Sequence, residues 1–156
     1  MTRRVRCRLN GDPAEFEVED RDLLLDVIRD RGLTGAKPSC EMEVCGACTV
    51  LLDGLPVSAC STLALEAEDR SLRTIEGVAQ NGNLSPVQRA FVECFALQCG
   101  FCTPGMILTA EALLDENPTP TRQEVLHWME GNICRCTGYE PIVGAILQAA
   151  AERRRR

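Results

Sequence analysis

Four cysteines in the first half of the chain constrain its fold more than any other feature. Four residues separate Cys40 from Cys45, two separate Cys45 from Cys48, and eleven separate Cys48 from Cys60. This is the spacing of a plant-type 2Fe–2S site, in which a loop wraps three thiolates around a small cluster and another element supplies the fourth. Gly46 stands where the backbone must approach the cluster, and glycine tolerates the dihedral angles that this requires. The alternatives are a zinc knuckle and a pair of disulfides.

The composition fits a chain whose cores need reinforcement. The 156 residues (17.1 kDa) include ten cysteines, with 45% hydrophobic and only 4% aromatic residues, so the cores depend on aliphatic side chains. Small cores of this kind gain stability from metals or disulfides. The basic start, residues 1–8, leads into no apolar stretch, and no run reaches transmembrane length. We therefore expect a cytoplasmic protein with no membrane span, whose reduced cysteines bind metal.

The charge of the chain argues against nucleic acid as a partner. The net charge is −6 and the sequence pI is near 4.9, whereas nucleic-acid binding needs a basic surface. The four arginines at 153–156 are the exception. We interpret them as a solvated tail on the last helix, where positive charge suits the helix dipole.

Alternating residues predict a small sheet at the start of the chain. Val5, Cys7 and Leu9 alternate with arginines, which is typical of a half-buried strand, and Asn10-Gly11 predicts a tight turn into a second strand. Cys7 lies on the apolar face of this pattern. We therefore interpret Cys7 as a core residue rather than a metal ligand.

A helix and a second hairpin complete the first predicted domain. Asp20 or Asp22 is placed to cap a helix that ends at Gly32, and Asp53-Gly54 predicts the turn of the second hairpin. A closing strand is expected over residues 71–75. These elements predict an α+β domain over residues 1–77.

The apolar period changes to that of helices beyond a polar joint at residues 80–83. Ser85-Pro86 predicts a helix that runs to about Leu97. The later helix starts are Thr103-Pro104, Thr121 with Glu124, and Pro141. Four short amphipathic helices predict a four-helix bundle-like domain over residues 84–156.

Four more cysteines lie in connections between these predicted helices. Cys99 and Cys102 join the first two helices, and Cys134 and Cys136 join the last two. Antiparallel helix pairs can bring both connections to one end of a bundle, where helix N-termini favour an anionic group. By itself this pattern also suits structural zinc, but beside a plant-type loop we interpret it as a second iron–sulfur site. Cys94 lies on an apolar helix face, which predicts a core residue.

Two segments carry a specific resemblance to a known family. Residues 98–105 read Gln-Cys-Gly-Phe-Cys-Thr-Pro-Gly, and residues 131–139 read Gly-Asn-Ile-Cys-Arg-Cys-Thr-Gly-Tyr. With the first cysteine set, they resemble the small iron–sulfur subunits of the xanthine oxidase family of molybdenum hydroxylases over nearly the whole chain. The resemblance implies an N-terminal β-grasp, plant-type ferredoxin-like domain and a C-terminal helical domain, each with one 2Fe–2S cluster.

The resemblance also implies roles for individual residues. The ligands of the cluster nearer the flavin would be Cys40, Cys45, Cys48 and Cys60. The ligands of the cluster nearer the molybdenum would be Cys99, Cys102, Cys134 and Cys136. Gln98 and Cys136 match the positions that approach the pterin cofactor in relatives.

One departure from the family pattern lies in the first loop. Relatives usually carry glycines between the first two loop cysteines, as in Cys-Gly-x-Gly-x-Cys, whereas this chain has Glu41, Met42, Glu43 and Val44. The backbone angles of this loop are therefore in question, although the ligands are not.

The resemblance implies an electron-relay subunit of a hetero-oligomeric molybdenum oxidoreductase. Electrons from a molybdopterin site would pass through two 2Fe–2S clusters to a flavin subunit or another acceptor. The chain has no G-x-G-x-x-G signature and is too short to enclose a flavin or pterin site beside two clusters. We therefore expect molybdopterin in a large partner subunit, FAD in a medium one, and no complete active site here. The alternatives are a free-standing ferredoxin-like carrier and a zinc-stabilised interaction module.

Overall fold

The computed structural model describes residues 2–155. Met1 and Arg156, which end the two predicted domain ranges, lie outside the described residues. The order of elements is β1 (Thr2–Leu9), β2 (Asp12–Glu19), α1 (Leu24–Asp30), β3 (Thr49–Leu52), β4 (Leu55–Ser58), the 3₁₀ helix η1 (Ala64–Ala67), β5 (Ser71–Arg73), the 3₁₀ helix η2 (Ile75–Gly77), α2 (Pro86–Glu93), α3 (Thr103–Glu116), α4 (Arg122–Trp128), the 3₁₀ helix η3 (Met129–Gly131) and α5 (Glu140–Arg153). Strands fill the first half and helices the second, so the fold is a mixed α and β one.

The first half is a five-stranded sheet built on two tight hairpins. The strand order is β2-β1-β5-β3-β4, with β1 and β5 parallel and the other neighbours antiparallel. Both hairpins turn through two residues with positive φ, Asn10-Gly11 and Asp53-Gly54. Such turns match the twist of antiparallel strands and need glycine or a short polar residue. The two turns that the sequence predicts are confirmed.

The predicted start of α1 is wrong in its capping residue. The N-cap is Leu23, which has no side chain able to bond the helix amides. The carboxylate of Asp22 instead accepts a hydrogen bond from the backbone amide of Glu19 at 2.7 Å. Asp22 thus stabilises the turn between β2 and the helix. This local hydrogen bond competes with helix capping, and the sequence pattern does not show which of the two forms.

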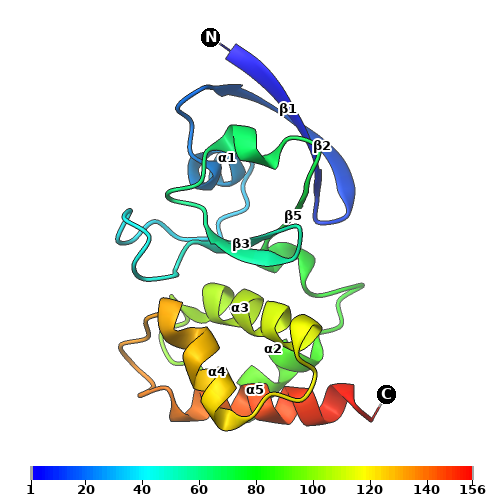
Figure 1. Ribbon diagram of the computed structural model, residues 1–156, viewed down its shortest axis with the longest axis vertical. Helices are drawn as coiled ribbons and strands as arrows, with labels where there is room; N and C mark the ends of the chain where they lie inside the picture. The colour runs from blue at the N-terminus through cyan, green and yellow to red at the C-terminus, as the bar shows by residue number, and fades with distance from the viewer. Residues whose placement is uncertain (1, 156) are drawn as a thin grey trace.

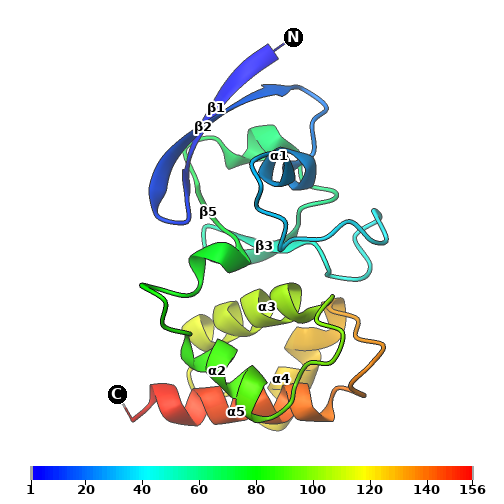
Figure 2. The ribbon, with the colours of Figure 1, turned by 180° about the vertical axis from the view of Figure 1, so that it is seen from behind.

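Strand β3 lies between the sheet's own core and the helices. All four of its residues are buried, because Val50 and Leu52 belong to the hydrophobic cluster under α1, while Leu51 belongs to the cluster formed by the helices. In Figures 1 and 2, α3 runs directly beneath β3, with α2, α4 and α5 on its far side. The sheet is therefore covered by helices on both faces at β3, and the two halves share this layer.

The helices begin largely where the sequence predicts. Ser85 and Thr121 each form a capping box, with Gln88 and Glu124 respectively. Helix α2 ends at Glu93 rather than near Leu97, because the chain reverses at the next residues to reach the second cysteine set.

The predicted solvated arginine tail is wrong for Arg153. Helix α3 buries the carboxylate of Glu111, which is 3% exposed and accepts a hydrogen bond from the Ser85 hydroxyl at 2.6 Å. The Arg153 guanidinium pairs with Glu111 and also with Asp115. A buried carboxylate needs such a partner, and this need draws the end of α5 onto α3.

Removing the Arg153 side-chain charge should therefore destabilise the fold. We expect Arg153→Met to lower the free energy of unfolding by about 3 kcal/mol, since it leaves Glu111 buried with no cation. The matched control is Arg122→Met, which breaks the exposed Arg122–Glu140 pair and should cost under about 1 kcal/mol. Chemical unfolding of both variants measures the difference, and equal losses would show that the Glu111 contact has no special weight.

Candidate metal centres

The first cysteine set lies on three segments around the start of the sheet. Cys40 and Cys45 belong to the loop between α1 and β3, Cys48 directly precedes β3, and Cys60 follows β4. Cys48 and Cys60 are buried, whereas Cys40 and Cys45 are half-buried. The set therefore has an inner pair against the sheet core and an outer pair near the surface.

The loop closes because two acidic residues adopt left-handed backbone angles. The φ angles are 53° at Glu41, 61° at Glu43 and 67° at Gly46. The loop therefore keeps its turns, although Glu41 and Glu43 stand where the family pattern has glycine. Non-glycine residues pay about 1–2 kcal/mol for this region, so the loop is strained at both glutamates.

These turns point backbone amides at the first thiol. The amides of Met42 and Val44 donate to Cys40, the second at 3.4 Å from Sγ. Together with the neighbouring Cys45, they lower the pKa of Cys40 to about 6. Hydrogen bonds to a thiolate stabilise its charged form, which is the form that binds metal.

The inner pair is joined by a hydrogen bond between thiols. Cys48 and Cys60 interact directly, and burial together with this contact raises the pKa of Cys48 to about 12. Cys40 and Cys45 form the outer pair in the same way. The structure thus brings the four residues of the first predicted ligand set together two by two.

The second set is assembled from two connections that are distant in sequence. Cys99 and Cys102 lie between α2 and α3, and Cys134 and Cys136 lie between η3 and α5. The Cys136 thiol donates to Cys99, with 3.5 Å between the sulfurs. Burial and a contact with Cys134 raise the pKa of Cys102 to about 12. The second set is also paired two by two.

Two side chains shape the second connection around Cys134. The Thr137 hydroxyl donates to the Cys134 sulfur at 3.2 Å, and the Cys134 amide donates to the Tyr139 hydroxyl at 3.0 Å. Tyr139 itself has a φ of 68°, which sets the turn into α5. The sequence motif therefore positions the sulfur through its neighbours as well as through its own spacing.

The donor sets fit 2Fe–2S clusters. Such a cluster takes four cysteine thiolates, two on each iron, and each set offers two pairs. Within residues 2–155, no three His, Cys, Asp or Glu side chains gather as a site for one metal ion. All ten cysteines lie among these described residues, and all are free thiols.

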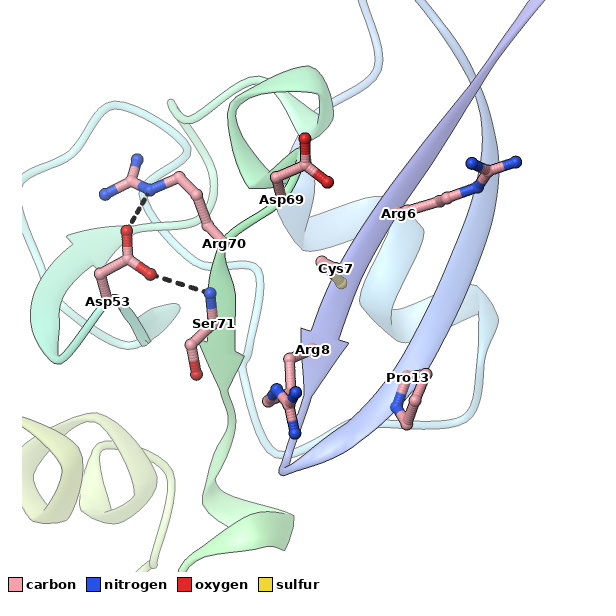
Figure 3. A pocket seen from close by; sticks show the side chains of 8 residues that line it. All are labelled: Arg6, Cys7, Arg8, Pro13, Asp53, Asp69, Arg70 and Ser71. Carbon is pink, nitrogen blue, oxygen red and sulfur yellow. Dashed lines mark hydrogen bonds and ion pairs between the residues drawn. The ribbon is translucent and has the colours of Figure 1, made fainter.

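Gln98 and Cys136, the two positions that the sequence relates to the pterin, are both exposed. Cys136 is also a member of the second set, where its thiol contacts Cys99. Cys7 lines an open pocket of about 420 Å³ between β1 and β5, where Asp53 accepts from Arg70 at 2.6 Å (Figure 3). Burial raises the pKa of Cys7, which belongs to the sheet core as predicted.

Sequence reasoning missed the contact between the two sites. Asn132 donates through Nδ2 to the Gly46 carbonyl at 3.2 Å, and the Ile133 amide donates to the Cys45 carbonyl at 2.9 Å. Gly131-Asn132 reads locally as a turn, and nothing in that pattern names a partner far away in sequence. The contact is visible only once the chain is folded.

The two halves match two family models that share one kind of cofactor. A model described as a 2Fe-2S iron-sulfur cluster binding domain matches residues 7–85, and one described as a [2Fe-2S] binding domain matches residues 74–147. The chain is also 49% identical over 149 residues to the nicotine 6-hydroxylase small subunit of Paenarthrobacter nicotinovorans, covering 95% of this chain and 90% of the relative. The chain belongs to the small iron–sulfur subunits of the xanthine oxidase family of molybdenum hydroxylases. The predicted resemblance is confirmed, and with it the two 2Fe–2S-binding units.

Another relative and a solved structure agree with this family. The xanthine dehydrogenase iron-sulfur-binding subunit of Escherichia coli O157:H7 is 42% identical, covering 92% of this chain and 91% of the relative. The structure of quinoline 2-oxidoreductase from Pseudomonas putida 86 contains a chain that is 49% identical, with a TM-score of 0.94 and coverage of 99% and 97%. In the residues described, no helix is long and apolar enough to cross a membrane.

The strain at Glu41 and Glu43 leads to a prediction about stability. Replacing both with glycine should raise the free energy of unfolding by up to about 1 kcal/mol per site, because glycine adopts left-handed angles without steric cost. The matched control is Glu66→Gly, in the 3₁₀ helix η1, which should destabilise the chain. Chemical unfolding separates them, and a loss of stability in the loop variant would contradict the strain.

Proposed function

We propose that this chain is the electron-relay subunit of a molybdenum hydroxylase. Each of the two thiol sets is paired two by two. In Figures 1 and 2, the loop before β3 and the connection into α5 lie at the same edge of the molecule. Family membership supports electron transfer as the task of such a chain. The relay then runs from a molybdopterin site to a flavin subunit or another acceptor.

The chain's own residues hold and tune the two centres. A bound 2Fe–2S cluster supplies one-electron transfer. The amides of the first loop stabilise negative charge at Cys40, and the Thr137 hydroxyl and the other Cys134 contacts lower the pKa of Cys134 although its burial opposes this. We assign Cys40, Cys45, Cys48 and Cys60 to the flavin-side centre. We assign Cys99, Cys102, Cys134 and Cys136 to the molybdenum-side centre.

The separate cores support the proposed division of the chain. One hydrophobic cluster belongs to the sheet and α1, and another to the helices, which supports domains over residues 1–77 and 84–156. We propose that α2, α3, α4 and α5 form a four-helix bundle-like unit. Cysteines that bind metal as thiolates are typical of a reducing compartment, and we propose the cytoplasm.

A first experiment tests the number and kind of centres. Iron and sulfide analysis of the full chain should find about four of each, and EPR should show two signals. Cys48→Ser and Cys134→Ser should each remove one signal. The double variant Cys7→Ala with Cys94→Ala should keep both signals at a stability cost of roughly 1–2 kcal/mol per site, since both residues pack on apolar faces.

The outcomes distinguish the alternatives. Stoichiometric zinc without sulfide would make the chain a zinc-stabilised module and would overturn the proposal. A single EPR signal, or loss of a signal in the double variant, would show that the ligand assignment is wrong.

Phe95 indicates where a partner binds, because its exposure and its backbone conformation do not stabilise the isolated chain. Phe95 is 82% exposed and has a φ of 52°. It occupies the position after helix α2 where the amides of Phe95 and Ala96 bond back to Val92 and Phe91, a motif in which glycine is usual. Its exposure and strain are both unfavourable in the free chain.

Other apolar side chains are exposed on the two connections that carry the second cysteine set, between α2 and α3 and between η3 and α5. They are Leu97, Phe101, Ile133 and Tyr139. Gln98 and Cys136 lie among them in sequence, and electrons from a pterin must enter at this end without intervening solvent. We propose that the large molybdopterin-binding subunit covers this surface, with a medium FAD-binding subunit near the first cysteine loop.

Truncating Phe95 should therefore weaken assembly without harming the fold. Phe95→Ala keeps the backbone strain and loses no burial, so stability should stay within about 0.5 kcal/mol, whereas affinity for the large subunit should fall roughly tenfold or more. Leu84→Ala, at another exposed apolar residue, is the control and should bind normally. The affinity is measured with the purified subunits. An unchanged affinity in Phe95→Ala would place the interface elsewhere, and the absence of any stable partner would favour a free-standing carrier.

A further inference from the structure

The chain contains a single lysine, and this lysine contacts both cysteine loops. Lys37 lies in the connection between α1 and β3, and its backbone amide donates to the carbonyl of Ala47 at 3.0 Å, inside the first cysteine loop. Its side chain extends to the ring of Phe101, with 5.8 Å between Nζ and the ring centroid. Phe101 stands between Cys99 and Cys102 of the second set. A residue beside the first loop therefore places its positive charge at the second.

The segment that carries Lys37 is fixed by several hydrogen bonds. Nζ of Lys37 donates to the Gly35 carbonyl at 3.0 Å. The Gly35 amide in turn donates to the Glu76 carboxylate at 2.8 Å, and the Arg29 guanidinium donates to the Ala36 carbonyl at 2.6 Å. The position of the ammonium group is thus set by its own segment as well as by the aromatic ring.

No carboxylate neutralises the charge of Lys37. Among the residues that the structure describes, Lys37 makes no ion pair, and its side-chain hydrogen bond goes to a neutral carbonyl. Arg70 and Arg153, by contrast, pair with carboxylates. A cation with only a neutral partner exerts its full electrostatic effect on the groups around it.

Phe101 connects this charge to a thiol of the second set. The Phe101 amide donates to Cys99, and this hydrogen bond is the main cause that lowers the pKa of Cys99, with Cys136 contributing. Hydrogen bonds to the sulfurs and nearby charge are among the factors that set the potential of an iron–sulfur cluster. Phe101 also belongs to the surface that we propose the large subunit covers, and such a cover would exclude the water that screens Lys37.

We propose that Lys37, although it belongs to the first half of the chain, raises the reduction potential of the molybdenum-side centre. This rests on the proposed function, because it requires a redox centre at the second set. Reduction adds one electron to that centre, and therefore one negative charge; no covalent bond changes and no proton is required. A fixed positive charge stabilises the reduced form, so the centre becomes a better acceptor for electrons from the molybdopterin side.

Three variants separate the charge of Lys37 from its packing. Lys37→Met removes the charge and keeps an unbranched side chain, Lys37→Arg keeps the charge, and Phe101→Leu removes the aromatic ring.

The matched control is Arg8→Met. Arg8 also donates to a nearby backbone carbonyl, that of Gly11 at 3.3 Å, and makes no ion pair within residues 2–155. In Figures 1 and 2, the turn between β1 and β2 lies at the opposite edge of the molecule from the loop before β3 and the connection into α5. Arg8→Met therefore makes the same change in net charge far from both cysteine sets.

The first measurement is a redox titration of both EPR signals in the full chain loaded with iron and sulfide. We expect Lys37→Met to lower the ratio of reduced to oxidised molybdenum-side centre, at a fixed potential, by roughly threefold to tenfold. For one electron, tenfold corresponds to about 59 mV. The flavin-side centre should shift less, and both Lys37→Arg and Arg8→Met should keep the wild-type potentials.

The second measurement is the rate at which an amine-directed reagent acetylates Lys37 in the loaded chain, followed by peptide mass spectrometry. A cation–aromatic contact at an exposed site contributes about 0.5–1 kcal/mol. We therefore expect Phe101→Leu to speed the acetylation of Lys37 roughly twofold to fivefold. Equal rates in the wild type and in Phe101→Leu would overturn the contact.

Acetylation also removes the charge after the chain has folded and been loaded. Because Lys37 is the only lysine, the acetylated wild type should show the same lowered potential as Lys37→Met, even if that variant loads poorly. Acetylated Lys37→Arg, in which no lysine can react, is the control and should keep the wild-type potential.

The remaining outcomes are decisive as well. An unchanged molybdenum-side potential in Lys37→Met or in the acetylated wild type would overturn the inference. An equal fall in Lys37→Arg or in Arg8→Met would overturn it too, since the effect would then come from packing or from net charge. Failure of the proposed function is distinct, because the wild-type chain would then lack two EPR signals.

Discussion

The close contact between the Gly46 carbonyl and helix α3 is the constraint on which the rest of the architecture depends. It exists only because Gly46 and Gly105 lack Cβ atoms. With α3 held there, Leu51 of β3 can enter the helical core while its neighbours Val50 and Leu52 fill the core of the sheet. The same contact brings Cys45 within one hydrogen bond of the segment that carries Cys134. Packing and the arrangement of the thiols therefore share one origin.

Electrostatics acts at two different depths in this molecule. Near the surface, backbone amides of a strained loop stabilise the Cys40 thiolate. In the interior, a buried carboxylate at Glu111 draws Arg153 inward and fixes the end of α5. In both arrangements specific donors stabilise a negative charge: backbone amides at Cys40 and a guanidinium at Glu111.

Much of this structure follows from local patterns in the sequence. The Asn10-Gly11 and Asp53-Gly54 turns and the capping boxes at Ser85 and Thr121 are readable because neighbours along the chain determine them. The thiol sets are predicted from spacing, and the structure forms two thiol pairs within each set, while the assignment of ligands stays a prediction. The roles of Asn132 and Arg153 cannot be predicted in this way, because each depends on a partner that only the tertiary fold supplies. The prediction that Asp22 caps α1 is wrong because its carboxylate accepts a hydrogen bond from the preceding turn instead.

The double burial of β3 bears on how the chain folds. A strand whose residues serve two cores cannot be completed by either half alone, since the first half without the helices would leave Leu51 in water, and the helices without the sheet would have a gap at its place. The two halves are thus expected to gain their final stability together, in one cooperative transition. A newly made chain would then mature as a unit only after its last helix has emerged.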